Sequence, residues 1–148
     1  MIPGYVMFRL GARTFALELT EVREIVRLEG LEHLPGTVAP MAGVIELRGN
    51  PLPVLDVRAG DACDGGDVLV MELDGDPVGV AVDQVLAVLS GAELPAAEEP
   101  PAKSLPAYVI GVRRSASGPV LLVDFRKLLD VAAEGWAEQL LDGTLAAV

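Results

Sequence analysis

The chain repeats itself, and this internal repeat limits its possible folds more than any other feature. GVIELRGNPLPVLDVR (43–58) aligns without a gap on GVRRSASGPVLLVDFR (111–126). The turn-forming and charged positions recur as pairs: Gly43 with Gly111, Pro51 with Pro119, Asp56 with Asp124, Arg58 with Arg126. A second gapless pair, 8–26 and 71–89, precedes the first in the same order. Alternating segments can match by chance, but two ordered blocks that share such residues indicate a duplicated unit, not a solenoid array.

The repeat divides the chain into two related halves, roughly 8–60 and 70–128, with 1–7 and 129–148 packing on them as terminal segments. Either half alone is too small for a comfortable core. We therefore expect the halves to pack together as a single domain spanning 1–148. The hydrophobic fraction of 51% and mean hydropathy of +0.44 favour a well-buried interior over disorder.

Each half contains about five short strand patterns separated by turn signals. The run 5–19 predicts a hairpin around Gly11–Arg13, with Phe15, Leu17 and Leu19 alternating against Ala16 and Glu18. VMELDGDPVGVAV repeats that shape around Asp74-Gly75, a strong hairpin signal. The run 43–58 predicts a hairpin hinged at Gly49-Asn50. Its Pro51 and Pro53 remove backbone donors and so indicate an edge or a loop on one side. The sequence thus predicts a mainly β fold of two pseudo-repeated five-stranded barrels packed together.

Two segments have helical spacing. TEVREIV places Val22, Ile25 and Val26 on one stripe, with Thr20 as a cap, which predicts a single turn between strands. At the C-terminus, DFRKLLD and EGWAEQLLDGTLAAV place Trp136, Leu140 and Leu141 on one stripe. This pattern predicts a C-terminal helix that packs on the barrels.

The charge balance restricts the partners. Eleven Lys and Arg oppose 22 Asp and Glu, a formal net charge of -11, so nucleic acid and anionic membrane surfaces are poor partners. No apolar stretch is long enough to cross a bilayer, and we expect no direct membrane insertion. The start does not resemble a secretory signal. Cys63 is the only cysteine and excludes an intramolecular disulfide. A cytoplasmic location is the simplest expectation.

Catalytic patterns are missing from the sequence. His33 is the only histidine, and neither it nor Cys63 lies in a nucleophile, zinc or phosphate-loop motif. We therefore expect no enzyme activity, no metal and no cofactor. The many carboxylates leave a carboxylate-dependent hydrolase as an alternative. A polyproline-binding barrel is disfavoured because the aromatic residues are scattered and do not line a groove.

Four passages resemble the CheW family of bacterial chemotaxis adaptors, in the order and spacing of that family, from about Tyr5 to Leu129: VREI (22–25), 43–58, PVGVAVDQVLAVLS (77–90) and YVIGVRRSASGPVLLVDFRKLL (108–129). The most specific element is G-V-x-x-L-R-G followed by P-V-x-D. The resemblance implies two five-stranded SH3-like β-barrels and a scaffold without catalysis. Such adaptors bridge the cytoplasmic tip of a chemoreceptor to the regulatory domain of a CheA-type histidine kinase. The kinase domain meets the adaptor barrel to barrel, and the groove between barrels takes the receptor's helical hairpin. An adaptor for another kinase pathway, in pilus or surface motility, is the alternative within this class.

The resemblance also suggests site residues. Arg48 matches the signalling arginine of the family, and Glu24 matches an acidic position on the binding surface. Glu46 lies two residues from Arg48, so the two are expected on one strand face, where an exposed ion pair is the simpler alternative. Asn50-Pro51 stands where the family commonly has apolar residues, which bears on partner choice. The predicted partner-binding set is completed by apolar residues near the groove, for which ordinary core packing is equally compatible, and by two glycines: Val22, Ile25, Val85, Val88, Gly43, Gly49.

Overall fold

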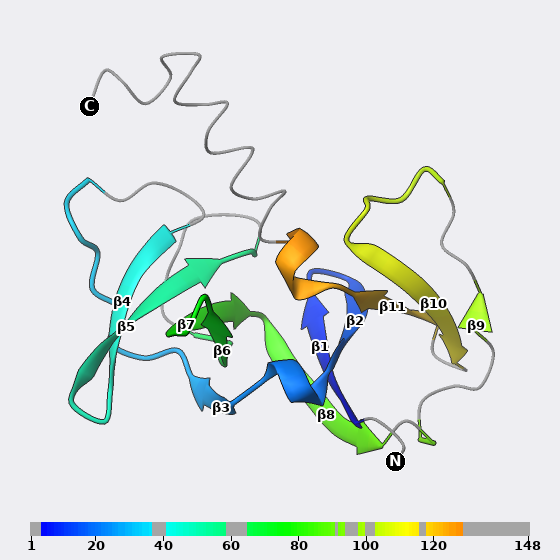
Figure 1. Ribbon diagram of the computed structural model, residues 1–148, viewed down its shortest axis with the longest axis horizontal. Coiled ribbons are helices and arrows are strands. Elements are labelled where there is room, and N and C mark those ends of the chain that lie inside the picture. The colour runs from blue at the N-terminus through cyan, green and yellow to red at the C-terminus, as the bar shows by residue number, and fades with distance from the viewer. Residues whose placement is uncertain are drawn as a thin grey trace.

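The computed structural model describes residues 4–36, 41–58, 65–90, 92–93, 98–99, 103–115 and 118–128. Within these residues the chain is mainly β, with two curled sheets side by side (Figure 1). One sheet has the order β8 (Gln84–Ser90), β1 (Gly4–Leu10), β2 (Arg13–Glu18), β11 (Gly118–Val123), β10 (Val109–Ser115) and the two-residue β9 (Glu98–Glu99). The other has the order β3 (Glu24–Arg27), β6 (Asp67–Leu73), β7 (Asp76–Val82), β5 (Asn50–Asp56) and β4 (Met41–Leu47). The predicted fold class is confirmed.

The two sheets do not coincide with the two sequence halves. The β1–β2 hairpin of the first half joins β8, β10 and β11 of the second, while the β6–β7 hairpin joins β3, β4 and β5. The expectation that each half closes on itself is therefore corrected. Only Asp83 separates β7 from β8. Because a tight hairpin needs two loop residues, the chain cannot fold back there and crosses into the other sheet.

The repeat is nevertheless retained in the strand pairing. Met7 pairs with Ala87 in one sheet, and their repeat mates Val70 and Glu24 pair in the other. The pairs Phe8–Phe15 and Met71–Val78 correspond in the same way, as do Ile45–Leu52 and Arg113–Val120. Apart from the additional β9, the two sheets thus share one strand order, and these pairs share one register. Differences between repeat mates consequently mark positions that this shared architecture does not dictate.

The β4–β5 turn lies one residue earlier than the sequence predicted. Leu47 pairs with Asn50, so the turn residues are Arg48, with φ of 49°, and Gly49, with φ of 82°. Positive φ at both positions defines a type I′ turn, which matches the twist of the flanking strands. The hinge is therefore Arg48-Gly49 and not Gly49-Asn50.

The prolines of β5 lie before the point at which this strand begins to pair with β7. β5 is an interior strand, but its parallel pairing with β7 begins only at Val54. Pro51 and Pro53 lie before that point, where a missing backbone donor disrupts no pairing with β7. The prediction that one side of this strand is unpaired is therefore correct before Val54. It is wrong from Val54 onward, where β5 pairs with β7.

The predicted single turn before β3 is present, but as a 3₁₀ turn over Leu19–Glu21 without a side-chain cap. Thr20 lies inside the turn and is not its cap. Ile25 and Val26 belong to β3, so they do not share a helical stripe with Val22. Glu24–Arg27 pairs with β6, and this pairing outweighs the local helical spacing.

A helix begins at Phe125, after β11. Asp124 caps it, since Oδ1 of Asp124 accepts a hydrogen bond from the Lys127 N–H at 3.1 Å. The description ends at Leu128, so the predicted stripe of Trp136, Leu140 and Leu141 lies outside the described residues.

Three of the charged residues shared by the repeats, Asp56, Arg58 and Asp124, have structural roles. Arg58 Nη2 lies 2.8 Å from Oδ2 of Asp56, and Arg58 Nη1 donates to the Gly65 carbonyl oxygen at 2.7 Å. These bonds join the end of β5 to the residues that precede β6. In the second half the mate of Asp56 is the helix cap Asp124. These three repeated residues thus serve the fold, and function has to be sought where the halves differ.

Three apolar clusters form the core. One lies between the sheets and includes Phe8, Leu17, Met71 and Val80; the other two lie within the individual sheets. The alternation predicted for β2 is only partly observed. Ala16 is buried as well, because the six-stranded sheet has a cluster of its own.

Asp67 connects the two sheets. Its Oδ2 accepts a 2.7 Å hydrogen bond from the backbone N–H of Val85 in β8, and its Oδ1 lies 3.1 Å from Nη1 of Arg27 in β3. The Asp67 side chain is only 12% exposed. A buried carboxylate with two donors thus holds the start of β8 against the five-stranded sheet.

Candidate functional site

An ion pair joins the β4–β5 turn to the edge strand β3. Nη1 of Arg48 lies 3.0 Å from Oε1 and 3.1 Å from Oε2 of Glu24. The Arg48 side chain is 71% exposed, whereas that of Glu24 is 30% exposed. Oε1 of Glu24 is itself shielded from solvent and receives Arg48 without a well-directed hydrogen bond. The two functional residues predicted from the family resemblance are therefore in contact.

The expectation that Glu46 and Arg48 lie on one strand face is wrong, and Arg48 pairs with Glu24 in place of the alternative partner Glu46. Arg48 lies in the turn, so the spacing of two residues does not place it on the strand face of Glu46. Instead, Glu46 lines a hollow of about 560 Å³ together with further residues of the hairpin and of the segment before it: Glu29, Gly30, Glu32, Val44, Ile45, Gly49, Pro51. Glu46 and Arg48 thus border different hollows.

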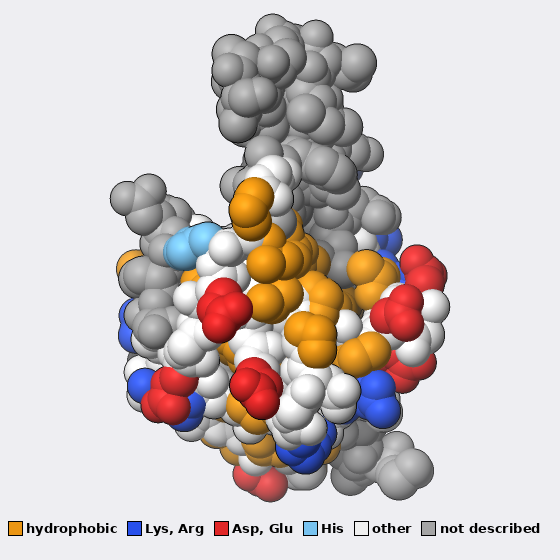
Figure 2. Space-filling model, turned by 90° about the vertical axis from the view of Figure 1, so that its left-hand side faces the viewer, with side chains coloured by type: hydrophobic (Ala, Val, Ile, Leu, Met, Phe, Trp, Pro, Cys, Tyr) orange, Lys and Arg blue, Asp and Glu red, His pale blue; other side chains and the backbone are white. Residues whose placement is uncertain are grey.

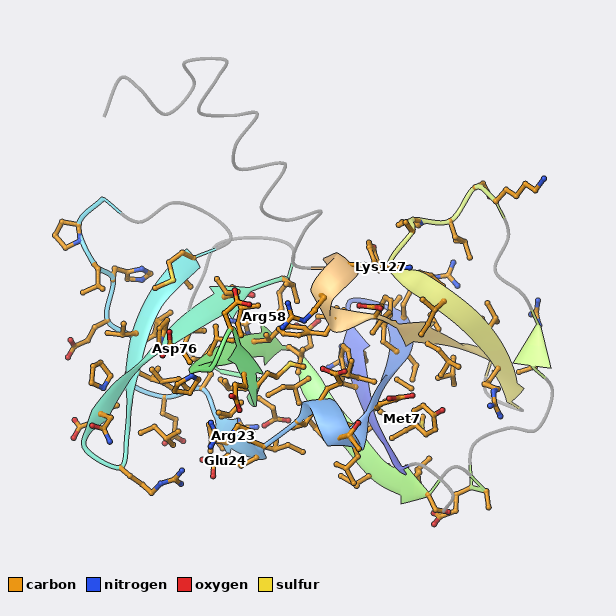
Figure 3. All side chains as sticks on the ribbon, viewed as in Figure 1. Met7, Arg23, Glu24, Arg58, Asp76 and Lys127 are labelled. Atoms are coloured by element: carbon orange, nitrogen blue, oxygen red, sulfur yellow. The ribbon has the colours of Figure 1, made fainter. Side chains whose placement is uncertain are left out.

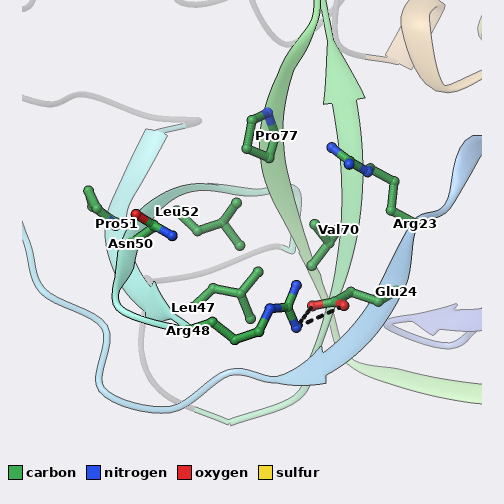
Figure 4. Close-up of a pocket in the computed structure, with 9 residues that line it drawn as sticks. All are labelled: Arg23, Glu24, Leu47, Arg48, Asn50, Pro51, Leu52, Val70 and Pro77. Atoms are coloured by element: carbon green, nitrogen blue, oxygen red, sulfur yellow. Dashed lines mark hydrogen bonds and ion pairs between the residues drawn. The ribbon is translucent and has the colours of Figure 1, made fainter.

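The Glu24–Arg48 pair borders a pocket of about 390 Å³ (Figure 4). Arg23 and Asn50 add polar groups to its border, and its apolar lining comes from both hairpins of the five-stranded sheet: Leu47, Pro51, Leu52, Val70, Pro77. Arg23 and Glu24 lie next to each other at β3 (Figure 3). The pocket combines an apolar floor with a charged rim, an arrangement suited to protein recognition.

The β4–β5 side of the molecule presents a mixed surface. Figure 2 shows apolar side chains gathered on this side, with separate acidic and basic side chains around them. Among the outward residues of these strands, Val44 and Pro53 lie opposite each other and are half-buried. This surface is continuous with the hairpin that carries Arg48.

Gly43 occupies a tight position within the fold. A Cβ atom there would overlap the carbonyl oxygen of Glu32, and the φ of 148° favours glycine. Glu32 and Val44 exchange two backbone hydrogen bonds at this point, of 2.8 and 2.9 Å. Close backbone contact therefore accounts for this glycine without a partner. Gly49, in contrast, is an exposed turn residue with open space around it.

The apolar candidates differ in exposure. Val22, Ile25 and Val85 are half-buried and pack against the cluster between the sheets, whereas Val88 is 52% exposed. Sequence reasoning missed Leu86 on the same edge strand, which is 44% exposed, and Leu19 in the 3₁₀ turn, which is 38% exposed. The signal for Leu86 was available, because β8 is apolar at both alternating positions. Leu86 is the repeat mate of Arg23. Sequence reasoning missed Arg23 as well.

Neither a metal-binding cluster nor a membrane-spanning helix is found in the described part of the chain. Its His, Cys, Asp and Glu residues form no group of three or more that could hold a metal ion. In these same residues, no helix is sufficiently long and apolar to span a membrane.

Fold and site together define a class: a duplicated, SH3-like β protein with a charged pocket and an apolar strand edge on its surface. Within this class, the chain belongs to the CheW family. The family described as "CheW-like domain" matches residues 4–133. The resemblance found in the sequence is thus confirmed.

Individual relatives agree with this assignment. The chain is 28% identical over 133 residues to the chemotaxis protein CheW of Klebsiella aerogenes, covering 84% of this chain and 80% of that protein. It is 23% identical over 136 residues to CheW of Treponema pallidum, with 83% and 79% covered. Among solved structures, the scaffolding protein TtCheW of Thermoanaerobacter tengcongensis matches with a TM-score of 0.67 and 26% identity, covering 84% of this chain and 90% of TtCheW.

Proposed function

We propose that this chain is a non-catalytic scaffold that couples chemoreceptors to a CheA-type histidine kinase in the cytoplasm. Membership of the CheW family supports the general role. TtCheW, which shares the fold, is itself described as a scaffolding protein. A scaffold acts through its surfaces, so the proposal depends on which surfaces are shaped for partners.

The observation that carries the proposal is the Glu24–Arg48 pair. It is open to solvent at Arg48, which is 71% exposed, and it joins two elements across a sequence separation of 24 residues. The repeat mates of these residues are Ala87 and Ala116, so the second half maintains the same strand order without either charge. We assign this site, including Glu46 and Gly49 of the same hairpin, to the kinase regulatory domain.

A second surface lies along β8. Val88 and Leu86 are exposed on this edge strand, and Val22, Ile25 and Val85 pack beneath on the cluster between the sheets. A helical hairpin buries apolar anchors in such a surface. We assign it to the chemoreceptor tip. Two separate surfaces allow one molecule to hold receptor and kinase at once.

Co-sedimentation tests the proposal. Membranes that carry the chemoreceptor are mixed with the CheA-type kinase, with and without this chain. The kinase should sediment only when the chain is present. A kinase that remains in the supernatant in both samples would contradict the coupling role. Substituting receptor and kinase from a pilus or surface-motility system distinguishes the alternative pathway.

A further inference from the structure

The pocket beside the Glu24–Arg48 pair has more hydrogen-bond donors than acceptors at its rim. Arg23 Nη1 lies 3.7 Å from Oε2 of Glu72, too far for a hydrogen bond, and both side chains are more than half exposed. The backbone N–H of Arg23 donates to the Val70 carbonyl oxygen at 2.7 Å, so its main chain is anchored. Among the described residues, the Arg23 guanidinium therefore has a fixed base and no hydrogen-bond acceptor.

Arg48 is also only partly engaged. It contacts Glu24 through Nη1 alone, and Nε and Nη2 have no partner within the described part of the chain. A guanidinium carries five N–H donors in a planar fork that suits carboxylates. The charged residues of the pocket are two arginines and one glutamate. The lining alone therefore has one more positive than negative charge on a chain with a net charge of -11, although Glu72, which does not line the pocket, lies 3.7 Å from Arg23.

The floor of the pocket suits a side chain with an apolar stem. Leu52 and Val70 are 2% and 3% exposed and present their apolar surface beneath the rim, flanked by Leu47 and Pro77. An Asp or Glu side chain could place its methylene groups on this floor and its carboxylate between the two guanidinium groups. Figure 4 shows Arg23 and Arg48 both bordering the pocket.

The charged residues of the pocket have no charged counterparts in the second half. The mates of Arg23, Glu24 and Arg48 are Leu86, Ala87 and Ala116, so all three charges are absent together from the second half. The mates of Pro51 and Leu52, in contrast, are Pro119 and Val120, which have the same character. The buried floor residues Leu52 and Val70 thus have apolar mates in the other repeat, Val120 and Met7, whereas the charged rim is specific to the first half.

We propose that this pocket receives an acidic side chain, aspartate or glutamate, from the kinase regulatory domain, and that Arg23 and Arg48 bind its carboxylate. This inference rests on the proposed function and names the partner chemistry of that site. Glu24 is a positioning residue that holds Arg48 at the rim. A singly charged carboxylate suits the rim better than a phosphate, because the Glu24 carboxylate borders the same pocket and repels a dianion.

The test uses Arg23→Glu in the full chain, with Arg126→Glu as a control of equal charge change. Arg126 is 65% exposed, its contact with the 82% exposed Asp74 is a long one of 3.8 Å, and it does not line the pocket. Binding to the purified kinase regulatory domain is measured by calorimetry. Arg23→Glu should weaken binding by about tenfold or more, and Arg126→Glu by less than about twofold. A panel of Asp→Arg and Glu→Arg variants of the kinase domain should contain one that restores binding to Arg23→Glu.

The outcomes are distinct. If the wild type binds and Arg23→Glu binds as well as Arg126→Glu, the acidic-side-chain inference is overturned while the scaffold proposal stands. The same holds if no charge reversal in the kinase domain restores binding. If the folded wild type does not bind the kinase domain, the kinase assignment and this inference fall together.

Discussion

Arg48 in the β4–β5 turn holds Glu24 on β3, with Nη1 3.0 Å from Oε1, across a sequence separation of 24 residues. The turn conformation places Arg48 away from the strand face of Glu46 and in contact with another element. Arg48 is 71% exposed and Glu24 is partly exposed, and an ion pair open to solvent on one side contributes about 1 kcal/mol to stability. Its value to the protein is therefore expected in binding.

Arg48→Gly tests this separation of stability from binding. Glycine relieves the left-handed conformation of Arg48, worth about 1 kcal/mol, and removes an ion pair worth at most about 1 kcal/mol. The two effects oppose each other, so the free energy of unfolding should change by less than about 1 kcal/mol while kinase binding weakens. Urea unfolding measures the first quantity. A loss of more than about 2 kcal/mol would show that the pair is a structural element.

Gly43→Ala should destabilise the fold strongly. Its Cβ atom would overlap the Glu32 carbonyl oxygen and separate the two backbone bonds between Glu32 and Val44. We expect a loss of more than about 2 kcal/mol in the free energy of unfolding. Gly49→Ala is the matched control, because open space surrounds Gly49 and only its φ of 82° opposes alanine, at about 1 kcal/mol. Equal losses in the two variants would contradict this account of Gly43.

Asp67→Ala should loosen the contact between the sheets. The substitution leaves the Val85 N–H without its acceptor and Arg27 without its carboxylate. An unpaired buried group costs about 1–3 kcal/mol, measured as a lower midpoint of denaturant unfolding. Glu72→Ala is the control in the same strand, since Glu72 is exposed and its contact with Arg23 is a weak one of 3.7 Å. A change no larger than that of Glu72→Ala would refute the role of Asp67.

Val88→Asp and Leu86→Asp should weaken receptor binding without unfolding the protein. Both side chains are about half exposed on the edge strand β8, so a carboxylate there remains solvated. Binding to a soluble helical hairpin from the receptor tip should fall in both variants and remain normal in Gln84→Asp, an exposed polar position of the same strand. Unchanged receptor binding in both apolar variants would exclude β8 as the receptor surface.

Much of the fold follows from local sequence signals. The three predicted hairpins and the 3₁₀ turn depend on residues close in sequence, such as Asp74-Gly75. Each of them lies close to its predicted position. The exchange of hairpins between the sheets could not be predicted in this way. It depends on the parallel contacts of β2 with β11 and of β7 with β5, which join distant parts of the chain.

The geometry of the candidate site could be predicted only in part. Family resemblance suggested Glu24 and Arg48 as partner-binding residues, and that role stays a prediction. Their contact requires β3 and the β4–β5 turn to meet, which alternation along a strand does not reveal. Alternation instead suggested Glu46 as the neighbour of Arg48. Leu19 and Leu86 were missed because the exposure of an apolar residue depends on which elements cover it.

The most direct test of the central claim is calorimetric titration of the kinase regulatory domain with wild type, Glu24→Ala and Arg48→Ala, after folding of each variant is verified. We predict micromolar binding by the wild type, about -8 kcal/mol, and weaker binding by both variants. No heat from a folded wild type, or equal affinity in all three proteins, would contradict the assignment of this ion pair to the kinase-binding surface.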